Sequence, residues 1–334
     1  MDTLNYITIH NYKSNKGRHF SGVKLSYQIF GQHLHTAPVV LVNHALTGNS
    51  NVAGENGWWT EIVGNNKAID TNIFTILAFD IPGNGHQNLE VVNEYDAFTA
   101  NDIARLFGLA IIELQIDELY AVIGGSLGGG IAWEMAVEFP NVIQNLVAIA
   151  TDWKATDWII GHNKVQFQIL ENSDKPLHDA RMMAMLYYRT PASFNLRFGR
   201  TLNKEGIYNI ESWLLHHGDK LQARFTLHAY KVMTYLLSSV DISKKYKNEQ
   251  EAFSRIRAKV HVIGINSDLL FVPDENKITV AQLKAIGKDA TYTEIDSVHG
   301  HDAFLIEFNQ LENHLKSVFK VKINNNQLLK RNLV

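Results

Sequence analysis

The chain has 334 residues, 46% of them hydrophobic and 19% charged, which is the composition of an ordinary globular protein with a large core. Its net charge of −3 argues against a nucleic-acid partner, and the absence of cysteine excludes thiol nucleophiles, thiolate metal ligands and disulfides. The N-terminus does not have the pattern of a signal peptide, and no apolar stretch reaches the ~18 residues of a membrane span. We therefore expect a cytoplasmic protein without a membrane partner.

The first 150 residues alternate strand and helix patterns. Two segments with alternating polarity predict an antiparallel hairpin, and later continuous apolar runs are typical of strands buried on both faces. The hairpin strands are 6–10 and 23–30, the buried strands are 39–42, 73–79 and 146–150, and a helical period covers 99–114.

The chemistry of the chain centres on residues 119–140. An apolar run from Leu119 to Ile123 leads into Gly-Gly-Ser-Leu-Gly around Ser126, and a helical period then continues to Phe139. This G-x-S-x-G pattern between a strand and a helix predicts a strained turn. It holds the Ser126 hydroxyl at a helix N-terminus, where backbone N–H groups stabilise an oxyanion. Because the pattern often occurs by chance, a glycine-rich turn with an incidental serine is the alternative.

The pattern changes between about 151 and 256, where strand-like runs stop and helical spacing predicts helices over 180–188 and 221–237. Afterwards the alternation returns. The predicted elements there are strands 260–265 and 291–295 and helices 274–286 and 303–319, and the polar tail from Lys320 is expected to fray. The sequence thus predicts an α/β protein with a mostly parallel, doubly wound sheet. Its core is 1–150 and 257–334, and 151–256 is an inserted helical lid.

A serine nucleophile needs a histidine base, and the base needs a carboxylate that orients it. In such sheets these residues follow in the order Ser, Asp or Glu, His, at the carboxyl ends of strands. Asp268 follows the penultimate predicted strand, and His299 and His301 follow the last one. Spacing does not choose between the two histidines. A metal site of His44, His299 and His301 is the alternative, and we favour the triad because nothing else completes the coordination.

Two loops after early strands contain polar and glycine residues. The loop 44–48 is the candidate for the second oxyanion donor, which in such enzymes comes from the loop after an earlier strand. The loop 80–85 fits neither common phosphate-binding spacing, so we interpret it as a turn.

These residues resemble the homoserine O-acetyltransferase family of α/β-hydrolase-fold enzymes. The similarity runs from about 39 to about 307 and includes the lid, which makes it more specific than the serine turn alone. The similar segments include HALTG at 44–48, GWW at 57–59, GGSLGG at 124–129, YRTP at 188–191, RFGR at 197–200, HGDKL at 217–221 and HGHDAFL at 299–305.

The resemblance implies roles for five residues in catalysis. Ser126 would be the nucleophile, Asp268 the orienting acid and His301 the base, and the N–H groups of Leu46 and Leu127 would hold the oxyanion. It also implies that Arg181, Tyr188 and Asp302 bind homoserine. A guanidinium suits an α-carboxylate, and a carboxylate suits an α-ammonium group.

The implied activity is ping-pong transfer of an acetyl group from acetyl-CoA to L-homoserine, a step of methionine biosynthesis. No cofactor would be bound permanently, and the resemblance implies a homodimer formed through lid helices. Three alternatives stay open. A hydrolase is favoured by the segment 82–87, which is closer to that of plain hydrolases. Another donor such as succinyl-CoA, or another hydroxyl acceptor, would use the same machinery. A catalytically inactive binding protein is the third.

Overall fold

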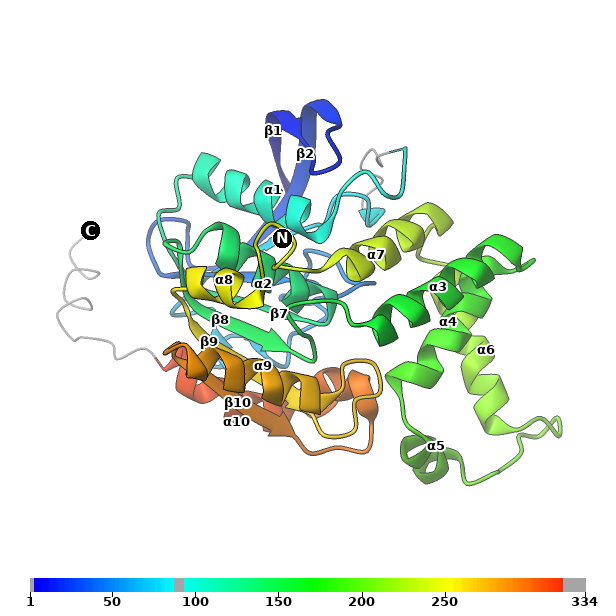
Figure 1. Ribbon diagram of the computed structural model, residues 1–334. Coiled ribbons are helices and arrows are strands. Elements are labelled where there is room, and N and C mark those ends of the chain that lie inside the picture. Colours follow the sequence, from blue (N-terminus) through cyan, green and yellow to red (C-terminus); the bar gives the residue numbers. More distant parts are fainter. Residues whose placement is uncertain (1–2, 87–92, 321–334) are drawn as a thin grey trace.

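The computed structural model describes residues 3–86 and 93–320, and Figure 1 shows their arrangement. The described residues contain an eight-stranded sheet in the order β1-β2-β6-β3-β7-β8-β9-β10 and a small sheet of β4 (Val63–Gly64) and β5 (Ile69–Asp70). The strands of the large sheet are β1 (Asn5–Lys13), β2 (His19–Gly31), β3 (Val39–Asn43), β6 (Thr75–Phe79), β7 (Leu119–Gly125), β8 (Ile143–Ile149), β9 (Lys259–Ile265) and β10 (Ala290–Ile295). Along the sheet from β6 to β10 every pairing is parallel, whereas β2 pairs antiparallel with both β1 and β6.

Each predicted strand is present, although β6 starts at Thr75 and not at 73, and the short strands β4 and β5 are not predicted from the sequence. β1 and β2 form the expected hairpin, with Ile7 opposite Leu25, while all residues of β3 and β6 are buried, as their continuous apolar runs require. The helix predicted at 99–114 is α1 (Ala100–Glu113), which starts at a capping box between Thr99 and Asp102. The helix after Ser126 is α2 (Leu127–Glu138), which is buried almost throughout because it packs between α1 and the sheet.

Six helices lie between β8 and β9 in the chain, and α3 to α6 stand to one side of the sheet (Figure 1). They are α3 (Asp157–Asn172), α4 (Pro176–Tyr188), α5 (Pro191–Phe198), α6 (Asn209–Gln222), α7 (Leu227–Ser239) and α8 (Glu249–Arg255). The prediction of one helix over 221–237 is wrong. Leu221 belongs to α6, and Thr226 caps the N-terminus of α7 by accepting from the Ala229 N–H. The limits 151–256 for a separate lid stay a prediction.

The C-terminal part contains α9 (Pro273–Ala285), the 3₁₀-helix η2 (Gly300–Leu305) and α10 (Phe308–Phe319). The single helix predicted at 303–319 is therefore wrong at its start, because a tight 3₁₀ turn around His301 precedes the α-helix. The expected fraying of the tail lies outside the described residues beyond Lys320. In the parts that the structure describes, no helix is long and apolar enough to cross a membrane.

Candidate active site

Ser126 occupies the sharp turn between β7 and α2. Its backbone φ is +55°, a left-handed value that costs free energy for a residue with a side chain. The neighbouring glycines are needed for space. A Cβ on Gly124 would lie 2.4 Å from the backbone of Gly128, and one on Gly128 would lie 2.3 Å from the carbonyl oxygen of Asn43. The strained serine turn predicted from the sequence is therefore present.

The hydroxyl of Ser126 is joined to a histidine and a carboxylate that come from distant parts of the chain. The Ser126 Oγ lies 3.0 Å from His301 Nε2, and His301 Nδ1 lies 2.8 Å from Asp268 Oδ2. The other carboxylate oxygen, Asp268 Oδ1, accepts the N–H groups of Leu270 at 2.7 Å and Phe271 at 2.9 Å. Asp268 is thus fixed by its own loop while it orients the imidazole.

His301 lies among aromatic rings. The ring centres of Tyr188, Phe271 and Phe304 are 5.6, 5.6 and 5.7 Å from that of His301, and only 4% of His301 is exposed. Burial by itself lowers the pKa of His301. The Asp268 carboxylate outweighs this effect and, with a further contribution from Asp302, holds the pKa above its ordinary value. The site therefore combines a dry environment with a histidine that readily accepts a proton.

The second histidine of the motif has a different partner. His299 Nδ1 lies 2.9 Å from the hydroxyl of Ser193 in α5, and its backbone N–H donates to Ser297. The choice that spacing left open thus falls on His301. Within residues 3–86 and 93–320 no group of three or more His, Asp or Glu side chains is arranged to hold a metal ion. The backbone N–H of Ile81 donates to the ring of His44, which lies in a separate network.

The candidate oxyanion loop lies against the start of α2. The Asn43 side chain donates to the carbonyl of Gly128 at 3.3 Å, and a Cβ on Gly128 would come within 2.7 Å of the His44 carbonyl oxygen. The N–H of Leu127 opens α2, so it has no acceptor within the helix. The loop that contains Leu46 and the helix that starts at Leu127 are therefore packed together beside Ser126.

The residues expected to bind an amino-acid substrate lie on α4 and η2. The Arg181 guanidinium lies 5.4 Å from the ring centre of Tyr188, the same ring that packs on His301. Asp302 forms an ion pair with Arg189, with Nε and Oδ2 3.0 Å apart, and both side chains are largely buried. The structure thus brings Arg181, Tyr188 and Asp302 to one side of the triad, and it adds Arg189 as the partner of Asp302.

Comparison with known proteins identifies the family. The model of the alpha/beta hydrolase fold matches residues 38–308. A homoserine O-acetyltransferase from Cyclobacterium marinum is 32% identical over 91% of this chain and 91% of its own length. The chain belongs to the homoserine O-acetyltransferase family.

Solved structures support the same fold. A homoserine O-acetyltransferase from Bacillus anthracis superposes with a TM-score of 0.86, at 21% identity, over 96% of this chain and 98% of the other. An acetylester hydrolase from Corynebacterium glutamicum superposes with a TM-score of 0.82, at 18% identity, over 96% of both chains. Transferases and hydrolases of the α/β-hydrolase fold thus share this architecture, so the fold alone does not distinguish the two activities.

In this member of the homoserine O-acetyltransferase family, Arg189 lies in the similar segment 188–191, but the sequence does not indicate a role for it. The signal was weak, because its partner Asp302 is 113 residues away in the chain. The shifted pKa of His217 on α6 also cannot be predicted from the sequence. Burial lowers the pKa of His217 to about 4, and the positive charges of Arg181, His216, Lys220 and Arg189 add to this effect.

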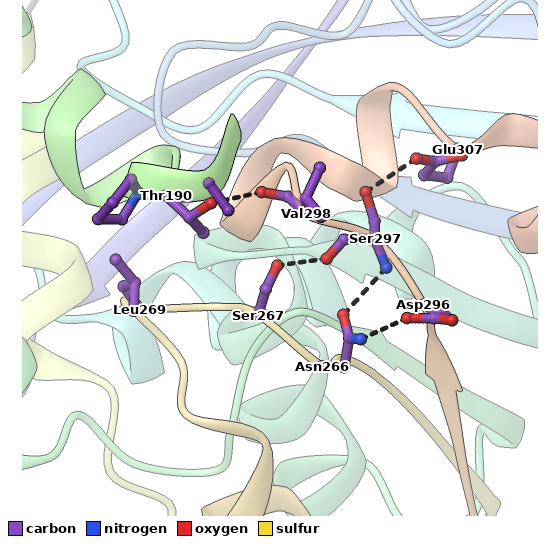
Figure 2. Close-up of a pocket in the computed structure, with 10 residues that line it drawn as sticks. Thr190, Asn266, Ser267, Leu269, Asp296, Ser297, Val298 and Glu307 are labelled. Atoms are coloured by element: carbon purple, nitrogen blue, oxygen red, sulfur yellow. Dashed lines mark hydrogen bonds between the residues drawn. The ribbon is translucent and has the colours of Figure 1, made fainter. Parts of the chain in front are cut away.

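A pocket of about 740 Å³ lies between the start of α5 and the loops that carry Asp268 and His301 (Figure 2). Ser267 joins these two loops, because its hydroxyl donates to the Ser297 carbonyl at 2.5 Å and accepts from the Gly300 N–H at 3.0 Å. Neither Ser126 nor His301 lines this pocket. We therefore interpret this pocket as a space beside the hydrogen-bonded triad loops, and not as the place where the reaction occurs.

Proposed function

We propose that this protein transfers an acetyl group from acetyl-CoA to the hydroxyl group of L-homoserine through an acetyl-serine intermediate, a step of methionine biosynthesis. The observation that carries the proposal is the hydrogen-bonded chain Ser126–His301–Asp268 in a member of the homoserine O-acetyltransferase family. Acetyl-CoA is a co-substrate in this proposal, and no permanently bound cofactor takes part.

In the first half-reaction His301 Nε2 takes the proton of the Ser126 hydroxyl, and Oγ attacks the thioester carbonyl. The N–H groups of Leu46 and Leu127 hold the oxyanion of the tetrahedral intermediate. The carbon–sulfur bond then breaks, and the proton on His301 passes to the departing thiolate. The products are free CoA and acetyl-Ser126.

In the second half-reaction His301 takes a proton from the homoserine hydroxyl, which attacks the acetyl ester. The bond to Ser126 Oγ breaks and Ser126 recovers its proton from His301. Arg181 is suited to bind the α-carboxylate of homoserine, and Asp302 is suited to bind its α-ammonium group. Tyr188, whose ring contacts both Arg181 and His301, would line the site between them. The lid and the aromatic rings around His301 keep water from the acetyl ester, as a transferase requires.

The proposal includes a homodimer formed through the lid helices. Large apolar side chains are exposed there, among them Trp158 on α3, Leu186 on α4, Leu196 on α5 and Leu215 on α6. Exposed apolar side chains grouped on one part of a monomer favour association. Sedimentation of the purified protein tests this, and a monomer at micromolar concentration would reject it. The proposal also keeps the cytoplasmic location, where a CoA thioester is available.

The activity is tested by following CoA release and O-acetylhomoserine formation together. We expect sustained CoA release only when homoserine is present, one product molecule per CoA, and neither signal from Ser126→Ala. Comparing the rates with homoserine and serine identifies the acceptor, and comparing the rates with acetyl-CoA and succinyl-CoA identifies the donor. CoA release at the same rate without homoserine would reject the transferase in favour of a hydrolase, and activity retained by Ser126→Ala would reject the acyl-serine chemistry.

A further inference from the structure

His44, directly after β3, has both ring nitrogens engaged and is only 1% exposed. The backbone N–H of Ile81 donates to His44 Nε2 at 3.0 Å, so this nitrogen is an acceptor. A neutral imidazole that accepts at one nitrogen carries its proton on the other. His44 Nδ1 therefore donates to the carbonyl oxygen of Ala45, which lies 2.8 Å away. Burial also lowers the pKa of His44, although the Asp80 carboxylate acts in the opposite direction, and this direction agrees with an unprotonated Nε2.

The carbonyl that His44 holds belongs to the same peptide group as the N–H of Leu46. This peptide is trans, so its oxygen and its hydrogen point to opposite sides of one rigid plane. The Gly48 N–H also donates to the Ala45 oxygen, at 2.9 Å. Two donors thus fix the direction of the carbonyl, and the direction of the Leu46 N–H is fixed with it.

The other end of this loop is held by the loop after β6. The Asp80 carboxylate accepts the backbone N–H of Ser50 at 2.8 Å and the Ser50 hydroxyl at 2.9 Å, and it also accepts the hydroxyl of Ser26. Asp80 is followed by Ile81, whose N–H holds the ring of His44. The segment 80–81 therefore supports the loop 44–50 at both ends, a task beyond the simple turn that the sequence predicted.

We propose that His44 is a positioning residue for the reaction. By holding the Ala45 carbonyl, it orients the Leu46 N–H toward the oxyanion of the tetrahedral intermediate that forms at Ser126. This inference rests on the proposed function, because it assumes that an acetyl-Ser126 forms. His44 does not contact the reacting atoms in this account. It acts through one peptide plane, and the loop after β6 fixes the proton position on its ring.

The test measures the acetyl-serine carbonyl in the full-length protein. The unmodified protein, His44→Gln, His44→Asn and the control His261→Asn react with ¹³C-carbonyl acetyl-CoA without homoserine. Intact mass gives the acetylated fraction, and isotope-edited infrared spectra give the carbonyl stretching frequency. The side chain in His44→Asn places a donor near the position of Nδ1, whereas that in His44→Gln reaches only the position of Nε2. His261 lies near the start of β9 and hydrogen-bonds to Thr291, away from the site.

Hydrogen bonds from the oxyanion donors lower the carbonyl frequency of the unmodified protein below that of the same acetyl ester after denaturation. We expect His44→Gln to move the carbonyl frequency toward the denatured value and His261→Asn to match the unmodified protein. The frequency of His44→Asn should lie between those of the unmodified protein and His44→Gln. We also expect His44→Gln to slow acetylation by up to about 10²-fold, the lower end of the cost of losing one oxyanion donor. Only molecules with a folded site acetylate, so partial unfolding does not shift the band.

An unchanged frequency in His44→Gln would overturn the role of His44 while leaving the proposed function intact. A missing adduct in the unmodified protein would instead overturn the proposed function, and this inference with it. Equal shifts in His44→Asn and His44→Gln would contradict the assignment of the donor to Nδ1.

Discussion

The two sides of the site differ in how their polar groups are satisfied. On the core side, Asp268 is bonded to His301 and to two backbone N–H groups, and His301 is bonded to Ser126. On the other side, formed by α4 and here called the lid side, Arg189 is paired with Asp302. Arg181, in contrast, lies over the ring of Tyr188, and no carboxylate among the described residues forms an ion pair with it. The core side is complete before any substrate arrives, whereas the lid side keeps a cation available.

This difference separates chemistry from recognition. Hydrogen bonds that already exist need no rearrangement during the reaction, which is how preorganised sites lower a barrier. A partly buried guanidinium without a carboxylate partner is instead suited to take one from a ligand. Changes on the core side should therefore reduce the rate of both half-reactions, and removal of the Arg181 charge should mainly weaken acceptor binding.

The largest effect is expected for Asp268→Asn. The amide oxygen still accepts from Leu270 and Phe271, so the fold is kept, but the amide nitrogen faces His301 Nδ1 and imposes the wrong tautomer. We expect acetylation of Ser126 to slow by about 10³-fold to 10⁴-fold, as in other triads. Rapid-quench measurement of the acetyl-enzyme checks this, with Asp274→Asn, an exposed residue of α9, as control. Less than a tenfold loss would mean that Asp268 does not orient the base.

Arg181→Gln should affect the acceptor alone. Loss of a hydrogen bond to a charged group costs about 1.5–3 kcal/mol, so we expect the KM for homoserine to rise by about 10-fold to 100-fold. The rate of acetylation by acetyl-CoA should stay unchanged. Arg197→Gln on α5, whose guanidinium stacks on Phe198 and Trp213, is the matched control. An equal loss in the acetylation rate would remove the distinction between the two sides.

Asp302→Asn should shift the pH profile. His301 must be neutral to act as a base, so activity falls as the pH drops through its pKa. The charge of Asp302 helps to raise that pKa, and its removal should move the acidic limb of kcat/KM to lower pH. The profile for acetylation, which needs no homoserine, checks this separately from acceptor binding. An acidic limb that moves to higher pH would contradict the electrostatic account.

The smallest effect on activity is expected for Glu134→Gln, where α2 meets the loop after α7. Burial raises the pKa of Glu134 to about 7, although the side chain of Asn101 and the N–H of Asp241 stabilise its charge. When folding raises the pKa of a carboxyl group, the folded state loses stability as the pH rises from the ordinary pKa, here about 4.5, to the pKa in the fold, here about 7.

We therefore expect the stability of the unmodified protein to fall relative to Glu134→Gln between pH 5 and pH 8, by up to about 3 kcal/mol. Denaturant titration at both pH values checks this, with the exposed Glu118→Gln as control. A stability difference that does not change with pH would show that Glu134 keeps its ordinary titration in the fold.

The core side was predictable from the sequence because its signals are local. The strand, glycines and helix around Ser126 are continuous in the chain, and the carboxyl ends of parallel strands necessarily bring Asp268 and His301 toward it. His299 and His301 are only two residues apart, so spacing left them equivalent. The tight 3₁₀ turn of η2 and the contact of His299 with Ser193 separate them.

The lid side was less predictable because its contacts are long-range. The pairing of Arg189 with Asp302 joins the end of α4 to η2, and no periodicity reports such a pairing. The break between α6 and α7 was missed because apolar residues continue across it, and the signal was the cap at Thr226. The role of His44 also cannot be predicted from the sequence, because it depends on which ring nitrogen faces the Ile81 N–H.

The most direct test of the account is the intact mass of the protein after rapid mixing with acetyl-CoA. We expect one added acetyl group, located on Ser126, that stays while homoserine is withheld and leaves when homoserine is added, with O-acetylhomoserine as the product. Failure to detect the adduct under rapid quenching, or its loss to water as fast as to homoserine, would contradict the account.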